Sequence, residues 1–414
     1  MSQFKVLIVT IPERGHINPL IGIVQCLQKM NLDIAFFSQG DISDQLNKAN
    51  IKCKCYTPKQ NFDIPNDLIA HGADFSKKIK DKEWMQRWIK TLLIDSVPFL
   101  VKELGDVVNV FEPDVIVSDP MVYATAIVAE KVDIPWAGIS NSLNPLTPKS
   151  WKSDLTETLH KYKNERLTLF SSIQRNIKFR VADLISPWLN TVFTSEDYIS
   201  RGLSNNDFSF YAGTPFPLKG NRGDEPPFPF DQINTTKKIV YMSLGSMVFY
   251  HPILFTTIAE AVEKLNVQLI LSVGDLYYED FSEKFPKDSI VLPYVPQLEI
   301  LKKVDVMISH GGANSILECL SHGVPMALLP ICNDQFFQAK FLEIAKTGIV
   351  LDTNKPDIDV YRSSLIQLLQ EDNIYRKNAE SIRKSLYQYE GPQKVADLIH
   401  QLLEKRQPLK PLVD

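Results

Sequence analysis

Residues 304–334 read VDVMISHGGANSILECLSHGVPMALLPICND, and their pattern predicts a strand–turn–helix–strand unit. The apolar runs at 304–309 and 325–330 predict buried strands, and residues 314–322 between them have helical spacing. The glycines at 311–312 predict a turn, and the lack of a Cβ there lets a phosphate approach the backbone. Unpaired backbone N–H groups and the positive end of the helix dipole meet where such a helix starts. The stretch therefore predicts a site for a nucleotide diphosphate.

Asn314 and Glu318 lie one turn apart on the same face of this predicted helix, so both side chains can reach one ligand. A glycine pair is also a routine strand–helix turn, and on its own it leaves that alternative open. The longer string HGGANSILECLSHGVPMALLPICNDQ, residues 310–335, resembles the donor motif of inverting glycosyltransferases of the UDP-glycosyltransferase superfamily. The resemblance implies the α/β GT-B fold, in which two Rossmann-like parallel-sheet domains face a central cleft.

The same resemblance implies the residues of the donor site. His310 is expected to contact phosphate and Glu318 to accept both ribose hydroxyls. Residues 243–246 (SLGS) resemble the family's SxGS element, and residues 292–301 (LPYVPQLEIL) resemble its WxPQ element, with tyrosine where plant members carry tryptophan. That tyrosine can also be an ordinary strand aromatic. The expected donor-binding set is Ser246, Tyr294, Val295, Gln297, His310, Gly312, Asn314, Ser315, Glu318, Asp334 and Gln335.

A candidate base lies in residues 15–19, Gly-His-Ile-Asn-Pro, between a strand at 4–11 and an amphipathic helix at 18–30. Proline in the first turn predicts that the helix starts at Asn18 and that His16 lies just outside it. The helix dipole there disfavours imidazolium, which predicts a neutral ring able to accept a proton near neutral pH. A histidine beside glycine is more often a plain loop residue. The stretch resembles the family's GHxNP motif, however, and this assigns the catalytic base to His16.

Asp119 is the expected partner of that base. The apolar strand at 113–118 ends at this carboxylate, and strand ends of a doubly wound sheet point into the ligand crevice. A carboxylate there can orient the imidazole and stabilise its charged form. Capping the helix expected over 122–131 is the alternative. The family places its histidine-orienting aspartate at the position matching Asp119.

Composition narrows the class of protein. The chain has 414 residues, which suits two domains of about 200 residues each. A net charge of −4 argues against a general nucleic-acid binder. Five irregularly spaced cysteines form no disulfide framework, which predicts reduced thiols and a cytoplasmic location. No signal peptide or membrane span is expected, and the polar end KRQPLKPLVD resembles soluble bacterial or plant members of the family.

Residues 214–237 are rich in proline and predict an extended linker. We expect an acceptor-binding domain over 1–213, a donor-binding domain over 238–387, and a last helix within 388–414 that crosses back to the first domain. The basic run between 161 and 178 predicts a solvated helix face. Weak candidates for the acceptor pocket are aromatic residues that can equally be core: Trp84, Trp88, Phe99 and Trp136.

The resemblance implies an inverting hexosyltransferase that moves a hexose, most directly glucose from UDP-glucose, to a hydroxyl of a small acceptor, and the aromatic candidates allow a largely apolar one. The family mechanism needs no metal or other cofactor, and no DxD-type carboxylate pair is evident in the donor segment. We expect a monomer or weak dimer that binds neither nucleic acid nor membrane. UDP versus dTDP stays open. The alternatives are an inactive nucleotide-sugar-binding or auxiliary protein, a lipid-directed transferase and an epimerase.

Overall fold

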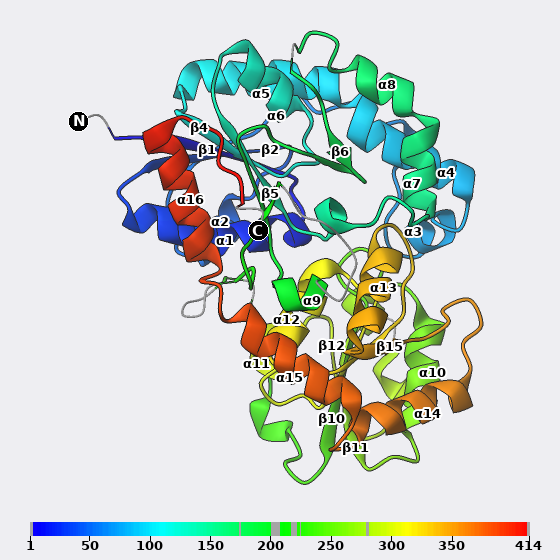
Figure 1. The fold of residues 1–414 in the computed structure, drawn as a ribbon. Helices are drawn as coiled ribbons and strands as arrows, with labels where there is room; N and C mark the ends of the chain where they lie inside the picture. The colour runs from blue at the N-terminus through cyan, green and yellow to red at the C-terminus, as the bar shows by residue number, and fades with distance from the viewer. Residues whose placement is uncertain are drawn as a thin grey trace.

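The protein folds into two α/β domains, each built on a parallel sheet (Figure 1). The computed structural model describes residues 3–173, 175–199, 208–216, 222–223, 225–278 and 281–411. Of the predicted linker, residues 217–221 and 224 lie outside the described residues. Among the described helices, none is long and apolar enough to cross a bilayer.

The N-terminal sheet has seven strands in the order β3-β2-β1-β4-β5-β8-β9, all paired in parallel. Central strands such as β1 are apolar along their length because helices cover both faces of the sheet. The strands are β1 (Lys5–Thr10), β2 (Asp33–Ser38), β3 (Lys54–Tyr56), β4 (Val115–Ser118), β5 (Trp136–Ser140), β8 (Leu189–Val192) and β9 (Phe210–Tyr211). A separate antiparallel pair is formed by β6 (Phe179–Arg180) and β7 (Asp183–Leu184).

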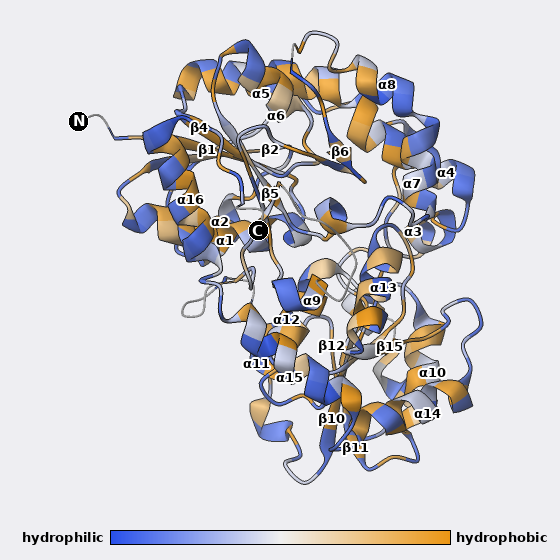
Figure 2. Ribbon diagram, viewed as in Figure 1, coloured by the Kyte–Doolittle hydropathy of each residue, from blue (hydrophilic) through white to orange (hydrophobic). Residues whose placement is uncertain are grey.

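The helices of this domain flank its sheet, and several of them show hydrophobic and hydrophilic stripes in Figure 2. They are α1 (Arg14–Lys29), α2 (Ser43–Lys48), α3 (Gly72–Lys78), α4 (Lys82–Lys90), α5 (Val97–Phe111), α6 (Ala124–Lys131), α7 (Asp154–Lys161), α8 (Lys163–Thr168) and α9 (Glu196–Ile199). A π-helical turn (Thr91–Asp95) separates α4 from α5 just before Pro98, as the proline predicts.

The C-terminal sheet has six parallel strands in the order β12-β11-β10-β13-β14-β15. They are β10 (Lys238–Ser243), β11 (Val267–Ser272), β12 (Ile290–Leu292), β13 (Val306–Ser309), β14 (Met326–Leu328) and β15 (Gly348–Val350). Its helices are α10 (Pro252–Val262), α11 (Gln297–Ile300), α12 (Ala313–Ser321), α13 (Gln335–Ala345), α14 (Ile358–Leu369) and α15 (Ile374–Leu386). Both sheets are doubly wound, and this confirms the predicted Rossmann-like class.

The last helix, α16 (Pro392–Lys405), returns to the N-terminal domain and packs on α1, as Figure 1 shows. Its buried face includes Val395, Ile399 and Leu402, which belong to the same hydrophobic cluster as Leu20 and Leu27 of α1. A helix from the end of the chain therefore completes the core of the first domain.

Some local predictions were wrong. Helix α1 begins at Arg14, with Glu13 as its N-cap, so His16 lies inside the first turn and Pro19 lies within the helix. The basic run is not a uniformly solvated face, because Arg166 is buried with its guanidinium 3.6 Å from the centre of the Phe179 ring.

Candidate active site

A cavity of about 520 Å³ lies between the two domains. The carboxyl ends of parallel strands meet at one edge of a doubly wound sheet, and loops from that edge of both domains line this cavity. The part formed by the N-terminal domain is mostly apolar, and its lining includes Phe75, Trp88, Leu92, Leu93, Val97, Leu100, Met121, Val122 and Leu155. The part formed by the C-terminal domain is mostly polar and contains the predicted donor residues. The cavity can hold an apolar and a polar ligand side by side.

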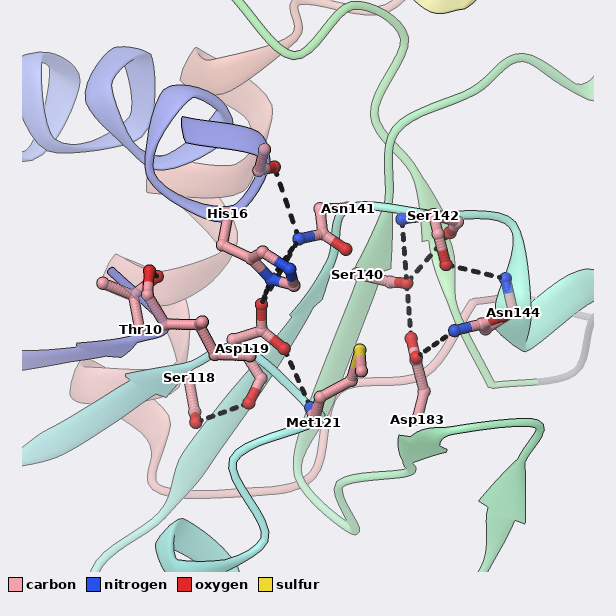
Figure 3. Close-up of polar contacts among 12 residues, drawn as sticks. Thr10, His16, Ser118, Asp119, Met121, Ser140, Asn141, Ser142, Asn144 and Asp183 are labelled. Carbon is pink, nitrogen blue, oxygen red and sulfur yellow. Dashed lines mark hydrogen bonds and ion pairs between the residues drawn. The ribbon is translucent and has the colours of Figure 1, made fainter. Parts of the chain in front are cut away.

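His16 and Asp119 form a charge-assisted pair on the N-terminal wall (Figure 3). The Nδ1 atom of His16, in the first turn of α1, lies 2.5 Å from Oδ2 of Asp119, which directly follows β4. The other oxygen of Asp119 accepts the backbone N–H of Met121 at 2.8 Å. The Asp119 carboxylate is buried. Because it accepts a hydrogen bond from Nδ1 of His16, Nε2 is the ring nitrogen that can take a proton.

The prediction of a neutral His16 near pH 7 was wrong. Burial of the ring lowers its pKa, but attraction to Asp119 and the hydrogen bond to it outweigh burial and raise the pKa of His16 to about 9. The helix dipole is the weaker influence because the Asp119 carboxylate is in direct contact with the ring. The free protein therefore holds His16 largely as imidazolium at neutral pH.

Pro19 has a structural consequence for this turn. A proline inside a helix removes the hydrogen bond to the carbonyl four residues earlier, here that of Gly15. The Gly15 carbonyl instead accepts the Nδ2 group of Asn314 at 2.7 Å, and Asn314 belongs to α12 in the other domain. The two motifs that suggested the family thus meet across the cavity in one hydrogen bond.

Asn141, which follows β5, is a site residue that the sequence did not reveal. Its Nδ2 lies 2.7 Å from Nδ1 of His16 and 3.3 Å from Oδ2 of Asp119 (Figure 3). Beside it, the buried Asp183 accepts hydrogen bonds from Ser140 and Asn144 at 2.5 and 2.7 Å. Burial raises the pKa of Asp183 to about 7 despite these hydrogen bonds. This second network holds the loop that carries Asn141.

His310 occupies the glycine-rich turn before α12, as expected. Its ring lies between two glycines: a Cβ on Gly312 would lie 2.7 Å from Nε2, and one on Gly245 would lie 2.7 Å from Cε1. Burial lowers the pKa of His310 to about 4, so the ring is neutral at pH 7. It can donate or accept a hydrogen bond at a phosphate, but it supplies no positive charge.

Glu318 lies on α12 with its carboxylate buried. Gln297 donates to one carboxylate oxygen at 2.7 Å, and Arg222 donates to the other at 2.6 Å. The Oε1 atom of Gln297 accepts the hydroxyl of Tyr241 at 3.2 Å. Two predicted donor residues are thus in contact, together with an arginine that the sequence did not single out.

The remaining predicted donor residues also line the cavity: Ser246, Tyr294, Val295, Gly312, Asn314, Ser315, Asp334 and Gln335. Tyr294 is 39% exposed, and the guanidinium of Arg14 lies 5.0 Å from the centre of its ring. Burial raises the pKa of Asp334. The Oε1 atom of Gln335 accepts the backbone N–H groups of Ile331 and Cys332, so this oxygen already holds its own loop.

Of the four candidate acceptor aromatics, Trp88 lines the cavity, and the other three do not. Trp84 stacks behind Trp88 and donates its indole N–H to the Asp67 carbonyl at 2.8 Å. Trp136 starts β5 and is buried in the core. Phe99 packs against Phe62. Trp84 therefore supports the wall from behind, and the buried Trp136 has the core role that the sequence left open.

Comparison with known proteins agrees with this arrangement. Residues 226–397 match the family described as UDP-glucoronosyl and UDP-glucosyl transferase. The uncharacterized UDP-glucosyltransferase YojK of Bacillus subtilis (strain 168) is 24% identical over 413 residues, 97% of this chain and 98% of the relative. The glycotransferase of kitacinnamycin superposes with a TM-score of 0.73 at 19% identity, covering 97% of this chain and 100% of the other. The glycosyltransferase SsfS6 of Streptomyces sp. SF2575, complexed with thymidine diphosphate, superposes with a TM-score of 0.68 at 17% identity. This match covers 96% of this chain and 100% of SsfS6.

The protein is therefore a glycosyltransferase with the GT-B architecture, two parallel-sheet domains that share one substrate cavity. Its C-terminal domain matches the family of UDP-glucoronosyl and UDP-glucosyl transferases, and the whole chain is similar to proteins of the UDP-glycosyltransferase superfamily.

Proposed function

We propose that the protein transfers a hexose, most directly glucose from UDP-glucose, to a hydroxyl group of a small and largely apolar acceptor, with inversion at the sugar carbon. The observation that carries the proposal is that His16, held by Asp119, lines a cavity that also contains the apolar residues of the N-terminal domain and the polar residues of the predicted donor site. An acceptor in the apolar part can present its hydroxyl to Nε2 of His16. A nucleotide sugar in the polar part can present its anomeric carbon to that hydroxyl, on the face opposite the diphosphate.

In this mechanism His16 removes the acceptor proton as the oxygen attacks the anomeric carbon, and the bond to the diphosphate breaks. Asp119 orients the ring and stabilises the imidazolium that forms. The N-terminus of α12 and the neutral His310 donate hydrogen bonds to the leaving diphosphate. Glu318 binds the ribose and Tyr294 stacks on the base.

Because backbone and side-chain donors stabilise the leaving group in this scheme, we propose that transfer needs no metal ion. We also propose that the protein acts in the cytoplasm as a monomer or weak dimer, and its five free cysteines suit a reducing compartment.

The test is a transfer assay with UDP-glucose and a panel of apolar hydroxyl compounds, with the product detected by mass spectrometry. We expect transfer by the native protein, unchanged by EDTA, and a loss of about 10²- to 10⁴-fold in kcat/KM for His16→Ala with UDP binding retained. His400→Ala, a substitution on α16, is the control. Full activity of His16→Ala would refute the assigned base. Nucleotide binding without transfer to any acceptor would favour a binding or auxiliary protein.

A further inference from the structure

Arg222 belongs to the described part of the interdomain segment, yet its side chain is a buried part of the donor pocket. Only 7% of the residue is exposed, and its Nη1 atom donates to Oε1 of Glu318 at 2.6 Å. Both side chains line the cavity between the domains. An arginine that links domains only as a spacer would keep its charge in water, so this burial calls for another role.

The backbone of Arg222 and of Gly223 is held in place. The Glu225 carboxylate accepts the backbone N–H of Arg222 at 3.0 Å and that of Gly223 at 2.9 Å. Gly223 has a φ of +84°, and a Cβ there would lie 2.6 Å from the backbone nitrogen of Ala49 at the end of α2. Gly223 is therefore packed closely on the N-terminal domain, while the side chain of Arg222 reaches the C-terminal domain.

The arginine fixes one half of the Glu318 carboxylate. Gln297 donates to the second oxygen at 2.7 Å, so each oxygen has one protein donor. A carboxylate oxygen has two acceptor positions, which leaves one position on each oxygen for a ligand hydroxyl. Only 3% of Glu318 is exposed, and a buried carboxylate without a partner would be costly. The guanidinium of Arg222 compensates this negative charge.

We propose that Arg222 is a positioning residue that aims Glu318 at the ribose and makes the donor site selective for ribonucleotides over 2′-deoxyribonucleotides. The proposal rests on the proposed function, in which Glu318 binds the ribose. A site built to hydrogen-bond a hydroxyl rejects an analogue that lacks it, because a buried acceptor then stays unpaired. Without Arg222 the carboxylate loses its fixed direction, and the two sugars become harder to distinguish.

The experiment is calorimetric titration with UDP and with 2′-deoxyuridine diphosphate, which differ by one hydroxyl. We expect the native protein to bind UDP at least about tenfold more tightly than the deoxy compound. Arg222→Ala is expected to weaken UDP binding about tenfold and to reduce this preference to about twofold or less. Arg222→Lys keeps the charge but not the planar donor fork, so we expect an intermediate preference.

Arg175→Ala is the matched control, because Arg175 also pairs with a glutamate, Glu130 at 2.9 Å, but does not line the cavity. It should leave both affinities unchanged. Thermal unfolding without ligand checks that each variant is folded, and Arg222→Lys supplies the test if Arg222→Ala does not fold. An unchanged preference in a folded Arg222 variant would overturn the proposal, as would tighter binding of UDP. A native protein that binds neither nucleotide would instead refute the donor function on which the proposal rests.

Discussion

At the scale of single residues, the electrostatics of His16 set the conditions under which the protein can work. Asp119 both holds the ring and stabilises its charged form, which makes the base strong but mostly protonated at neutral pH. A strong base takes the acceptor proton readily once it is neutral. The same contact that raises the basicity of His16 therefore limits the fraction of active protein near pH 7.

The first prediction follows from this pKa of about 9. Only neutral His16 can accept the proton, so kcat/KM should rise about tenfold per pH unit from pH 7 and level off above about pH 9. Asp119→Asn removes the attraction that raises the pKa, so the plateau should fall while the rising limb moves to lower pH. A pH–rate profile of both proteins checks this. A native profile that is flat between pH 7 and 9 would contradict the assigned charge state.

At the scale of elements, the position of His310 in the turn between β13 and α12 depends on two glycines, one in this turn and one in the loop after β10. Gly245 and Gly312 leave just enough room for the His310 ring between them. Gly245 also has a φ of +80°, in the left-handed region that favours glycine, whereas Gly312 has an ordinary φ of −62°. Substitution of Gly312 therefore tests the packing of the ring without backbone strain.

Gly312→Ala is expected to displace His310 and to weaken UDP binding about tenfold or more, since phosphate donors at the helix start would be blocked or moved. Gly105→Ala is the matched control: it lies within α5 and a Cβ there meets nothing within 4 Å. This control should stabilise the protein by about 0.5–1 kcal/mol and leave binding unchanged. Calorimetry and thermal unfolding measure the two effects. Native affinity in Gly312→Ala would show that the ring position is not critical.

The elements that the sequence predicted correctly are those in which local pattern and tertiary role agree. Around His310, an apolar run predicted the strand, the glycines predicted the turn, and helical spacing predicted the helix. The structure has all three elements where they were expected. The start of α1 was missed because Pro19 looks like a first-turn residue, whereas here its missing N–H frees the Gly15 carbonyl for Asn314. That contact comes from a residue 299 positions away in the chain, so no local pattern can reveal it.

Residues of the candidate active site that act through contacts between distant parts of the chain were likewise not predicted. The sequence predicted the His16 and Glu318 motifs because each lies within a short, distinctive string. It did not predict Arg222 or Asn141, whose roles arise only when the two domains and the loop after β5 come together. Trp84 and Trp136 were candidates because they are aromatic, and aromatic residues serve core and pocket equally well. Only the folded arrangement separates those uses.

At the scale of the whole molecule, α16 joins the end of the chain to the core of the first domain. Ile399 is fully buried in the cluster shared with α1. Ile399→Ala should therefore lower the free energy of unfolding by about 2–5 kcal/mol, because it leaves a cavity in that core. Gln401→Ala, on the partly exposed side of α16, should change it by less than about 0.5 kcal/mol. Urea denaturation measures both, and equal stability of the two variants would contradict the structural role of α16.

Thermal unfolding of the protein with and without UDP tests whether the C-terminal domain holds a nucleotide-sugar donor site. UDP at 100 times its dissociation constant should add about 2.7 kcal/mol of stability, a clearly measurable rise in Tm. Glu318→Ala should remove most of this rise, whereas Glu299→Ala, which breaks only an exposed pair with Lys302 in the same domain, should retain it. No rise with UDP or dTDP in the native protein would contradict the presence of that site.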